Sequence, residues 1–254
     1  MEYQTLLFEP GTITRITLNR PNAANGLDDV LCAELADAAA RCSEAKVVLL
    51  TGSGRFFCAG GDLRAMAASP LGPGAFVKGI ADDLHTAMQI FARMDAVLIT
   101  AVNGTAAGAG FSLAVSGDLV LADESASFTM AYTRAGLSPD GGSSYLLPRL
   151  VGLRRAQELI LTNRTLSAAE ALDWGLVTEV AADLPARADQ LAAEIVAGSG
   201  TANGAVKRLL RETYRNDYAE QLALEAALIA ANADAADGKE GIDAFLNKRS
   251  PQFG

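Results

Sequence analysis

The sequence is poor in the side chains that build metal centres and disulfide frameworks. Its 254 residues include one histidine and three cysteines, and aromatic residues make up only 6%. Because His85 is the only histidine, a three-histidine metal site is excluded. Cys32, Cys42 and Cys58 form no CxxC pair, so neither a disulfide framework nor a thiolate zinc site is indicated. We therefore expect a cytoplasmic protein that is long enough to bury a core without covalent staples.

The sequence also lacks an excess of positive charge and a long apolar run. It has 21 basic and 30 acidic residues, a net charge of −9 that argues against general nucleic-acid binding. The longest apolar candidate, residues 96–102, falls far short of the ~20 residues of a membrane span. Glu2 and Glu9 stand where a secretory signal would carry basic residues. We expect neither nucleic acid nor membrane as a partner, and a small anionic ligand is compatible with this charge.

The first 150 residues alternate strand and helix patterns. Residues 12–18 alternate β-branched and polar side chains, which is typical of a half-buried strand. Residues 46–51 and 96–102 are continuous apolar runs, which suit strands covered on both faces. Helical patterns occupy residues 28–41 and 75–94. This alternation predicts an α/β layered core.

Helical patterns dominate the rest of the chain, apart from a strand signal at residues 175–180. They cover residues 153–161, 167–174, 185–197, 202–214, 218–234 and 239–247. The glycine-rich segment 198–204 is the best linker candidate. We therefore divide the chain into a core at residues 1–200 and a C-terminal helical region at 201–254, whose Ala/Leu faces cover either the core or a neighbouring subunit.

Two glycine-rich segments, residues 58–62 and 103–110, follow predicted strands. Glycine lets a ligand approach the backbone closely, and the start of a helix offers N–H groups that favour negative charge. Two such turns would form an oxyanion site with two donors. The alternative is that they are tight turns whose glycines serve packing alone. Neither segment matches a Rossmann fingerprint or a GxxxxGK phosphate loop.

Three polar residues outside these turns are candidates for chemistry. Ser138 and Pro139 predict a helix start, where Asp140 either complements the helix dipole or acts as a base among nearby leucines. His85 lies in a helical pattern, and we expect it to be either a hydrogen-bonded residue without a catalytic role or a general base. Ser112 lies in a degraded G-x-S-x-G pattern, but the only histidine precedes it, so a structural role is favoured.

Seven motifs, taken together, identify the chain as a member of the enoyl-CoA hydratase/isomerase (crotonase) superfamily. In chain order they occupy residues 19–21, 48–63, 101–104, 136–142, 147–152, 175–177 and 244–251. The resemblance implies a spiral of repeated ββα units and a C-terminal helical region used for trimerisation. It also implies an acyl-CoA thioester as substrate, no metal or redox cofactor, and a homotrimer or a dimer of trimers.

The resemblance also assigns roles to residues. The backbone N–H groups of Gly61 and Ala109 match the pair that holds the thioester oxygen in this family, in agreement with the two turns described above. The expected substrate-binding residues are Cys58, Ala59, Gly60, Asp62, Leu63, Gly108, Tyr132 and Lys248. The loop 58–63 is expected near the adenine end of CoA, and Lys248 near the CoA phosphates, reaching them across subunits in some relatives.

The departures from the family pattern bear on the reaction. Ser112 and Tyr132 occupy the positions of the two glutamates of a true hydratase. Asp140 instead aligns with the acid of Δ3,Δ2-enoyl-CoA isomerases and of ring-epoxide isomerases of the phenylacetyl-CoA pathway. We therefore expect a double-bond isomerase with Asp140 as its base, and keep a hydratase as the first alternative.

Two further alternatives remain. Residues 161–166 and 173–177 resemble 4-chlorobenzoyl-CoA dehalogenases, which would make Asp140 a nucleophile and His85 a general base. The aromatic cage of those enzymes corresponds here to Gly61, Leu84 and Tyr132, which leaves a single aromatic residue and weakens this reading. A binder of acyl-CoA without turnover is the last alternative.

Overall fold

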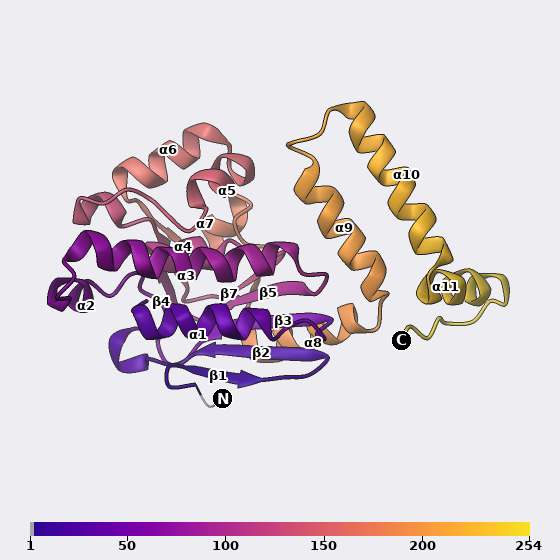
Figure 1. Cartoon of the computed structure of the whole chain (residues 1–254), viewed down its shortest axis with the longest axis horizontal. Helices are drawn as coiled ribbons and strands as arrows, with labels where there is room; N and C mark the ends of the chain where they lie inside the picture. Colours follow the sequence, from indigo (N-terminus) through magenta and orange to yellow (C-terminus); the bar gives the residue numbers. More distant parts are fainter. Residues whose placement is uncertain (1–2) are drawn as a thin grey trace.

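Two β-sheets form the framework of the computed structural model, which describes residues 3–254 (Figure 1). The larger sheet has the order β1-β2-β3-β5-β7-β10 and is parallel except for β1. Its strands are β1 (Leu6–Glu9), β2 (Ile13–Leu18), β3 (Val47–Gly52), β5 (Val97–Val102), β7 (Leu119–Asp123) and β10 (Glu179–Ala181). The smaller sheet, in which only β9 is antiparallel, consists of β4 (Phe56–Cys58), β6 (Thr105–Ala107), β8 (Ser127–Thr129) and β9 (Thr165–Ser167).

The chain winds between the two sheets in repeated turns. Strands β3 and β4 are followed by α2 (Leu63–Ala68) and α3 (Pro73–Arg93), and β5 and β6 by α4 (Ala109–Ala114). Strands β7 and β8 are followed by the short helix η2 (Tyr132–Ala135), α5 (Ser143–Leu150) and α6 (Gly152–Thr162). Each turn thus adds one strand to each sheet and then a helical segment. The predicted spiral of ββα units is confirmed.

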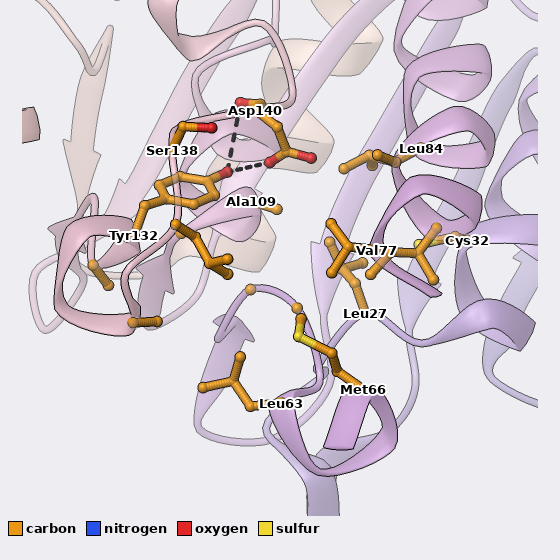
Figure 2. A pocket seen from close by; sticks show the side chains of 18 of the residues that line it. Leu27, Cys32, Leu63, Met66, Val77, Leu84, Ala109, Tyr132, Ser138 and Asp140 are labelled. Atoms are coloured by element: carbon orange, nitrogen blue, oxygen red, sulfur yellow. Dashed lines mark hydrogen bonds between the residues drawn. The ribbon is translucent and has the colours of Figure 1, made fainter. Parts of the chain in front are cut away.

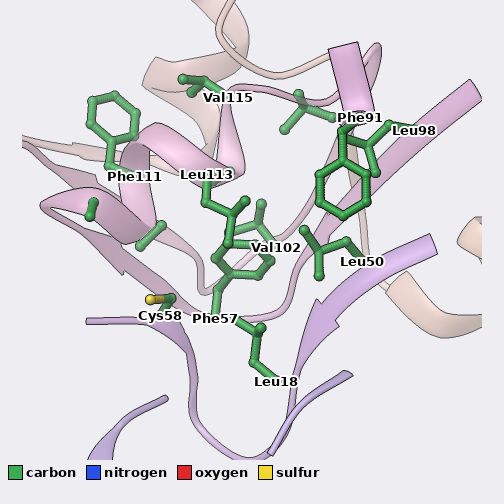
Figure 3. Close-up of a cluster of buried hydrophobic side chains, with 14 of the residues drawn as sticks. Leu18, Leu50, Phe57, Cys58, Phe91, Leu98, Val102, Phe111, Leu113 and Val115 are labelled. Carbon is green, nitrogen blue, oxygen red and sulfur yellow. The ribbon is translucent and has the colours of Figure 1, made fainter. Parts of the chain in front are cut away.

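The larger sheet is covered on both faces. Val48 and Leu50 of β3 join the main core with α1 (Asp29–Ala40) and α3, while Val47 and Leu49 point to the opposite face against α8 (Leu184–Val196). This arrangement explains why β3 and β5 are continuous apolar runs. Phe57, at the centre of Figure 3, fills the main core among side chains of both sheets and α3.

After α7 (Ala168–Asp173) and α8, which covers the larger sheet, the C-terminal helices leave the core stepwise (Figure 1). Helix α9 (Gly200–Glu212) lies against the core through Lys207, which is only 9% exposed. Its Nζ lies 2.7 Å from Asp118 Oδ2 and donates to the carbonyl oxygens of Ala96 (2.6 Å) and Phe91 (3.1 Å). Helices α10 (Tyr218–Asp234) and α11 (Ala236–Leu246) project away, and α10 has no residue buried by the described chain. Between residues 3 and 254, no helix is long and apolar enough to cross a membrane.

Two expectations about local structure are wrong. Residues 200–204 of the expected linker belong to α9, which Ser199 caps by accepting a hydrogen bond from the Ala202 N–H. The helix expected to start at Ser138 begins at Ser143 instead. Gly141 and Gly142 have φ of +58° and +74°, a left-handed conformation that a helix does not contain, so Asp140 lies in the preceding loop.

Candidate active site

A mostly apolar pocket of about 410 Å³ opens between the loop after β4, the helices α2 and α3, and the segment from η2 to Asp140 (Figure 2). Helix α3 contributes Val77, Ile80 and Leu84 from one face, at the spacing of successive helical turns. Leu27, Leu63 and Met66 complete much of the apolar wall. Sequence reasoning named only Leu63 of these six as substrate-binding. The face of α3 was visible as a periodic pattern, but nothing in the pattern separated a pocket wall from core packing.

The two glycine-rich turns meet at this pocket, whose wall includes Gly61 and Ala109. On one side of the first turn, Leu27 accepts a hydrogen bond from the Asp62 N–H and donates one to the Gly60 carbonyl, both at 2.8 Å. Ala109 is the first residue of α4, where an N–H has no partner within the helix. Within residues 3–254, neither the Gly61 N–H nor the Ala109 N–H donates a hydrogen bond. Both residues thus lie on the pocket wall with an amide that has no hydrogen-bond partner among the described residues.

The close contact of these turns requires glycine. Gly60 has φ of +91°, and a Cβ there would lie 2.7 Å from the Ala107 carbonyl oxygen. A Cβ on Gly110 would lie 2.1 Å from the carbonyl oxygen of Cys58, so only glycine lets α4 approach β4 this closely. Cys58 is fully buried beneath this contact, and burial raises the pKa of its thiol to about 12. The structure places the Cys58 side chain in the core and not on the pocket wall, and its expected part in substrate binding stays a prediction.

Asp140 supplies the only carboxylate on the wall of this pocket among the residues that the structure describes. Tyr132 donates its hydroxyl proton to Asp140 Oδ1 at 2.5 Å (Figure 2). The Asp140 carbonyl oxygen accepts hydrogen bonds from the hydroxyls of Ser112 (2.9 Å) and Ser143 (3.0 Å). Ser112 and Tyr132, the residues at the two hydratase glutamate positions, thus both contact Asp140. Sequence reasoning did not foresee this cluster.

His85 lies on α3 beside the Asp140 loop, outside the pocket wall. Its Nε2 accepts a hydrogen bond from the Gly141 N–H at 3.1 Å and is 3.7 Å from Asp140 Oδ2. Accepting this bond uses the Nε2 lone pair, so this nitrogen is not free to take a proton in the observed arrangement. Of the two roles that the sequence allows for His85, a hydrogen-bonded residue or a base, this geometry fits the first.

The remaining expected site residues divide into two groups. Ala59, Gly60, Leu63, Gly108 and Tyr132 lie on the pocket wall, whereas Asp62 and Lys248 do not. Asp62 caps α2 by accepting hydrogen bonds from the N–H groups of Arg64 and Ala65, and it pairs with Arg20 at 3.1 Å. Lys248 lies two residues after the end of α11, a helix that projects away from the core (Figure 1).

One basic side chain on the wall was not foreseen. Lys78 of α3 lines the pocket and forms an ion pair with Asp82 one helical turn later, with Nζ and Oδ2 2.5 Å apart. No group of three or more His, Cys, Asp and Glu side chains within residues 3–254 is arranged to hold a metal ion. The pocket wall thus offers the amides of Gly61 and Ala109, together with one carboxylate, one phenol, one ammonium, the hydroxyl of Ser138 and the thiol of Cys32.

Two main-chain N–H groups without a hydrogen-bond partner in the described part of the chain and one carboxylate lie on a single apolar pocket wall, and such groups can stabilise negative charge on an oxygen and move a proton. The family model described as "Enoyl-CoA hydratase/isomerase" matches residues 9–254, and the chain belongs to this family. It is thus an enzyme that processes acyl-CoA thioesters.

Individual relatives match 90–100% of the chain and carry different names. The chain is 39% identical to the 1,2-epoxyphenylacetyl-CoA isomerase of Escherichia coli (strain K12), over 100% of this chain and 98% of that protein. The crystal structure of an enoyl-CoA hydratase from Polaromonas sp. JS666 is similar with a TM-score of 0.93 at 34% identity, covering 98% of this chain and 99% of that one. A Thermobifida fusca YX relative, crystallised in complex with CoA, has a TM-score of 0.83 at 34% identity, covering 90% of this chain and 92% of that one.

Proposed function

We propose that this protein is a double-bond isomerase that converts 3-enoyl-CoA thioesters into 2-enoyl-CoA thioesters, with Asp140 as the base. The observation that carries the proposal is that Asp140 is the only carboxylate on the described pocket wall, which also presents the free amides of Gly61 and Ala109. One carboxylate suffices for isomerisation, because the proton taken from one carbon can be returned to another.

The proposed reaction has two proton transfers and no change in oxidation state. Asp140 takes a proton from C2, and the electron pair of that C–H bond moves into a dienolate whose negative charge lies largely on the thioester oxygen. The N–H groups of Gly61 and Ala109 donate to this oxygen, and each such donor is typically worth ~10²–10³ in rate. Protonated Asp140 then delivers the proton to C4, and the double bond shifts from C3–C4 to C2–C3.

Water addition has less support in this pocket. A hydratase must also bind, orient and activate a water molecule. The hydroxyls of Ser112 and Tyr132, at the two glutamate positions, are hydrogen-bonded to Asp140. Neither position carries a carboxylate, and both hydroxyl protons are already donated to Asp140, so neither side chain replaces a glutamate that would activate a water molecule. We expect crotonyl-CoA to lose no enoyl absorbance when it is mixed with the protein.

The test is Asp140→Asn, which keeps the shape of the side chain and removes its basicity. We expect turnover of 3-hexenoyl-CoA to fall by ~10²–10⁴, with little change in the Kd for the acyl-CoA, because proton transfer belongs to the transition state. Formation of the conjugated enoyl product is followed by absorbance. Asp173→Asn, at an exposed acid at the end of α7 that is not part of the pocket wall, is the matched control. Near-normal isomerisation by Asp140→Asn would show that another residue is the base.

A ring-epoxide substrate is the second candidate. The full-length similarity to 1,2-epoxyphenylacetyl-CoA isomerase favours it. Assaying 1,2-epoxyphenylacetyl-CoA beside 3-hexenoyl-CoA, with product identity determined by mass spectrometry and NMR, distinguishes the two by kcat/KM. For either substrate we propose a cytoplasmic homotrimer or dimer of trimers that needs no metal, with Lys248 of one subunit reaching the CoA phosphates of another.

A further inference from the structure

We infer that Tyr132 is a positioning residue that occupies Oδ1 of Asp140 and thereby leaves Oδ2 as the oxygen that exchanges the proton with the acyl chain. This inference rests on the proposed function, since it specifies how the base is held. It concerns a phenol that reaches the carboxylate from the pocket wall, on η2.

The direction of each proton in the cluster follows from the distances. Ser112, which is fully buried, has one hydroxyl proton and donates it to the Asp140 carbonyl oxygen at 2.9 Å. At the 3.3 Å contact between the Ser112 and Tyr132 hydroxyls, Ser112 is then an acceptor at most. The Tyr132 proton goes to Asp140 Oδ1, which is closer at 2.5 Å and charged. Oδ1 is thus engaged before any substrate binds.

The second carboxylate oxygen has no such partner. Within the described residues Oδ2 accepts no hydrogen bond, and the nearest basic group is His85 Nε2 at 3.7 Å, which already accepts from the Gly141 N–H. In Figure 2 this oxygen points away from Tyr132 and toward Leu84, another residue of the pocket wall. Because Oδ1 is held by Tyr132 and Oδ2 has no hydrogen-bond partner among these residues, Oδ2 is the carboxylate oxygen whose lone pairs are left for the acyl chain.

The phenol is suited to remain a donor. Burial, followed by the charge of Asp140, raises the pKa of Tyr132 above its usual value near 10. Tyr132 therefore stays protonated over the pH range in which an acyl-CoA enzyme is assayed. The backbone is held as well. Ser112 and Ser143 donate to the Asp140 carbonyl oxygen, and His85 accepts from the Gly141 N–H, so both polar groups of the peptide between Asp140 and Gly141 are engaged.

The experiment removes only the phenol oxygen. Tyr132→Phe keeps the ring on the pocket wall, and Tyr145→Phe, at an exposed position on α5, is the matched control. We expect kcat for 3-hexenoyl-CoA to fall by about 10–100-fold in Tyr132→Phe, with KM within about threefold, because a base displaced by even a small distance loses reactive geometry. Tyr145→Phe should match the wild type.

A spectroscopic measurement makes the result independent of turnover. A short O–H···O bond to a carboxylate gives a downfield proton resonance, which we expect in the full-length wild type and in Tyr145→Phe, and not in Tyr132→Phe or Asp140→Asn. Absence of this resonance from the wild type overturns the inference, and so does a Tyr132→Phe enzyme with wild-type kcat. A wild type that shows the resonance but converts no enoyl-CoA instead contradicts the proposed function.

Discussion

His85 shows how distance and hydrogen bonding separate two roles for the same side chain. Its Nε2 is 3.7 Å from Asp140 Oδ2, but its lone pair already accepts the Gly141 N–H. It therefore helps to hold the loop that carries Asp140, and its side chain is 41% exposed. A base needs a lone pair directed at the reacting proton or water, which this arrangement does not provide.

We predict that His85→Ala lowers the isomerase kcat by less than about tenfold, because an unsatisfied amide costs roughly 1–3 kcal/mol locally without removing the base. The measurement compares His85→Ala with Asp140→Asn on 3-hexenoyl-CoA. If both variants are equally impaired, and a covalent adduct on Asp140 is found by intact mass after quenching, the dehalogenase-like hydrolysis with His85 as base becomes the better account.

At this scale the sequence predicted the individual residues better than their contacts. Gly61, Ala109 and Asp140 could be named in advance because glycine-rich turns and family motifs mark them. The contact between Tyr132 and Asp140 joins the short helix η2 to the loop that follows it, and the left-handed Gly136 lies in the connection between the two residues. No periodicity encodes such a placement, so this contact was not foreseen.

At the scale of elements, Lys207 ties α9 to the sheet. Its ammonium is almost fully buried and meets one carboxylate and two carbonyl oxygens. Removing one partner of a buried ion pair leaves the other without compensation, which costs more than the pair itself contributes. Lys207 thus anchors α9, the first helix of the C-terminal region, to the core.

We predict that Lys207→Met lowers the free energy of unfolding by roughly 2–3 kcal/mol, somewhat less than for a fully buried pair because Asp118 is partly exposed. Urea denaturation gives the value. The matched control is Arg15→Ala, which removes a pair with Asp189 at 2.6 Å on the surface and should cost under about 1 kcal/mol. Equal effects of the two substitutions would contradict the assigned role of Lys207.

Long elements were predictable and short ones were not. The helices expected at residues 28–41, 75–94 and 218–234 appear as α1, α3 and α10 with boundaries shifted by at most two residues, because each carries several periods of helical patterning. The smaller sheet was missed because its strands have three residues each, too few to show an alternation. The helix start was misplaced at Ser138 because its capping signals lie just ahead of two left-handed glycines.

For the whole molecule, the projecting arm is the feature that a single chain leaves unexplained. Large apolar side chains on α10 and α11 are exposed, including Ile229, Ile242 and Phe245, the last of them 82% exposed. A monomer rarely exposes so many apolar groups close together.

We therefore predict a trimer or hexamer at micromolar concentration, with these side chains covered by neighbouring subunits. Light scattering coupled to size-exclusion chromatography measures the mass. The double substitution Ile229→Asp and Phe245→Asp should shift the population toward monomers. Leu71→Asp, at an exposed leucine between α2 and α3, is the control. A monomeric mass for the wild type would contradict this prediction.

The two amides on the pocket wall belong to the main chain, and this has a consequence for how such a protein diverges. Nearly every amino acid placed at position 61 or 109 still carries an N–H, and only proline removes it. Substitutions can therefore change the acid at position 140, the phenol at position 132 or the apolar wall, while the N–H groups at positions 61 and 109 remain.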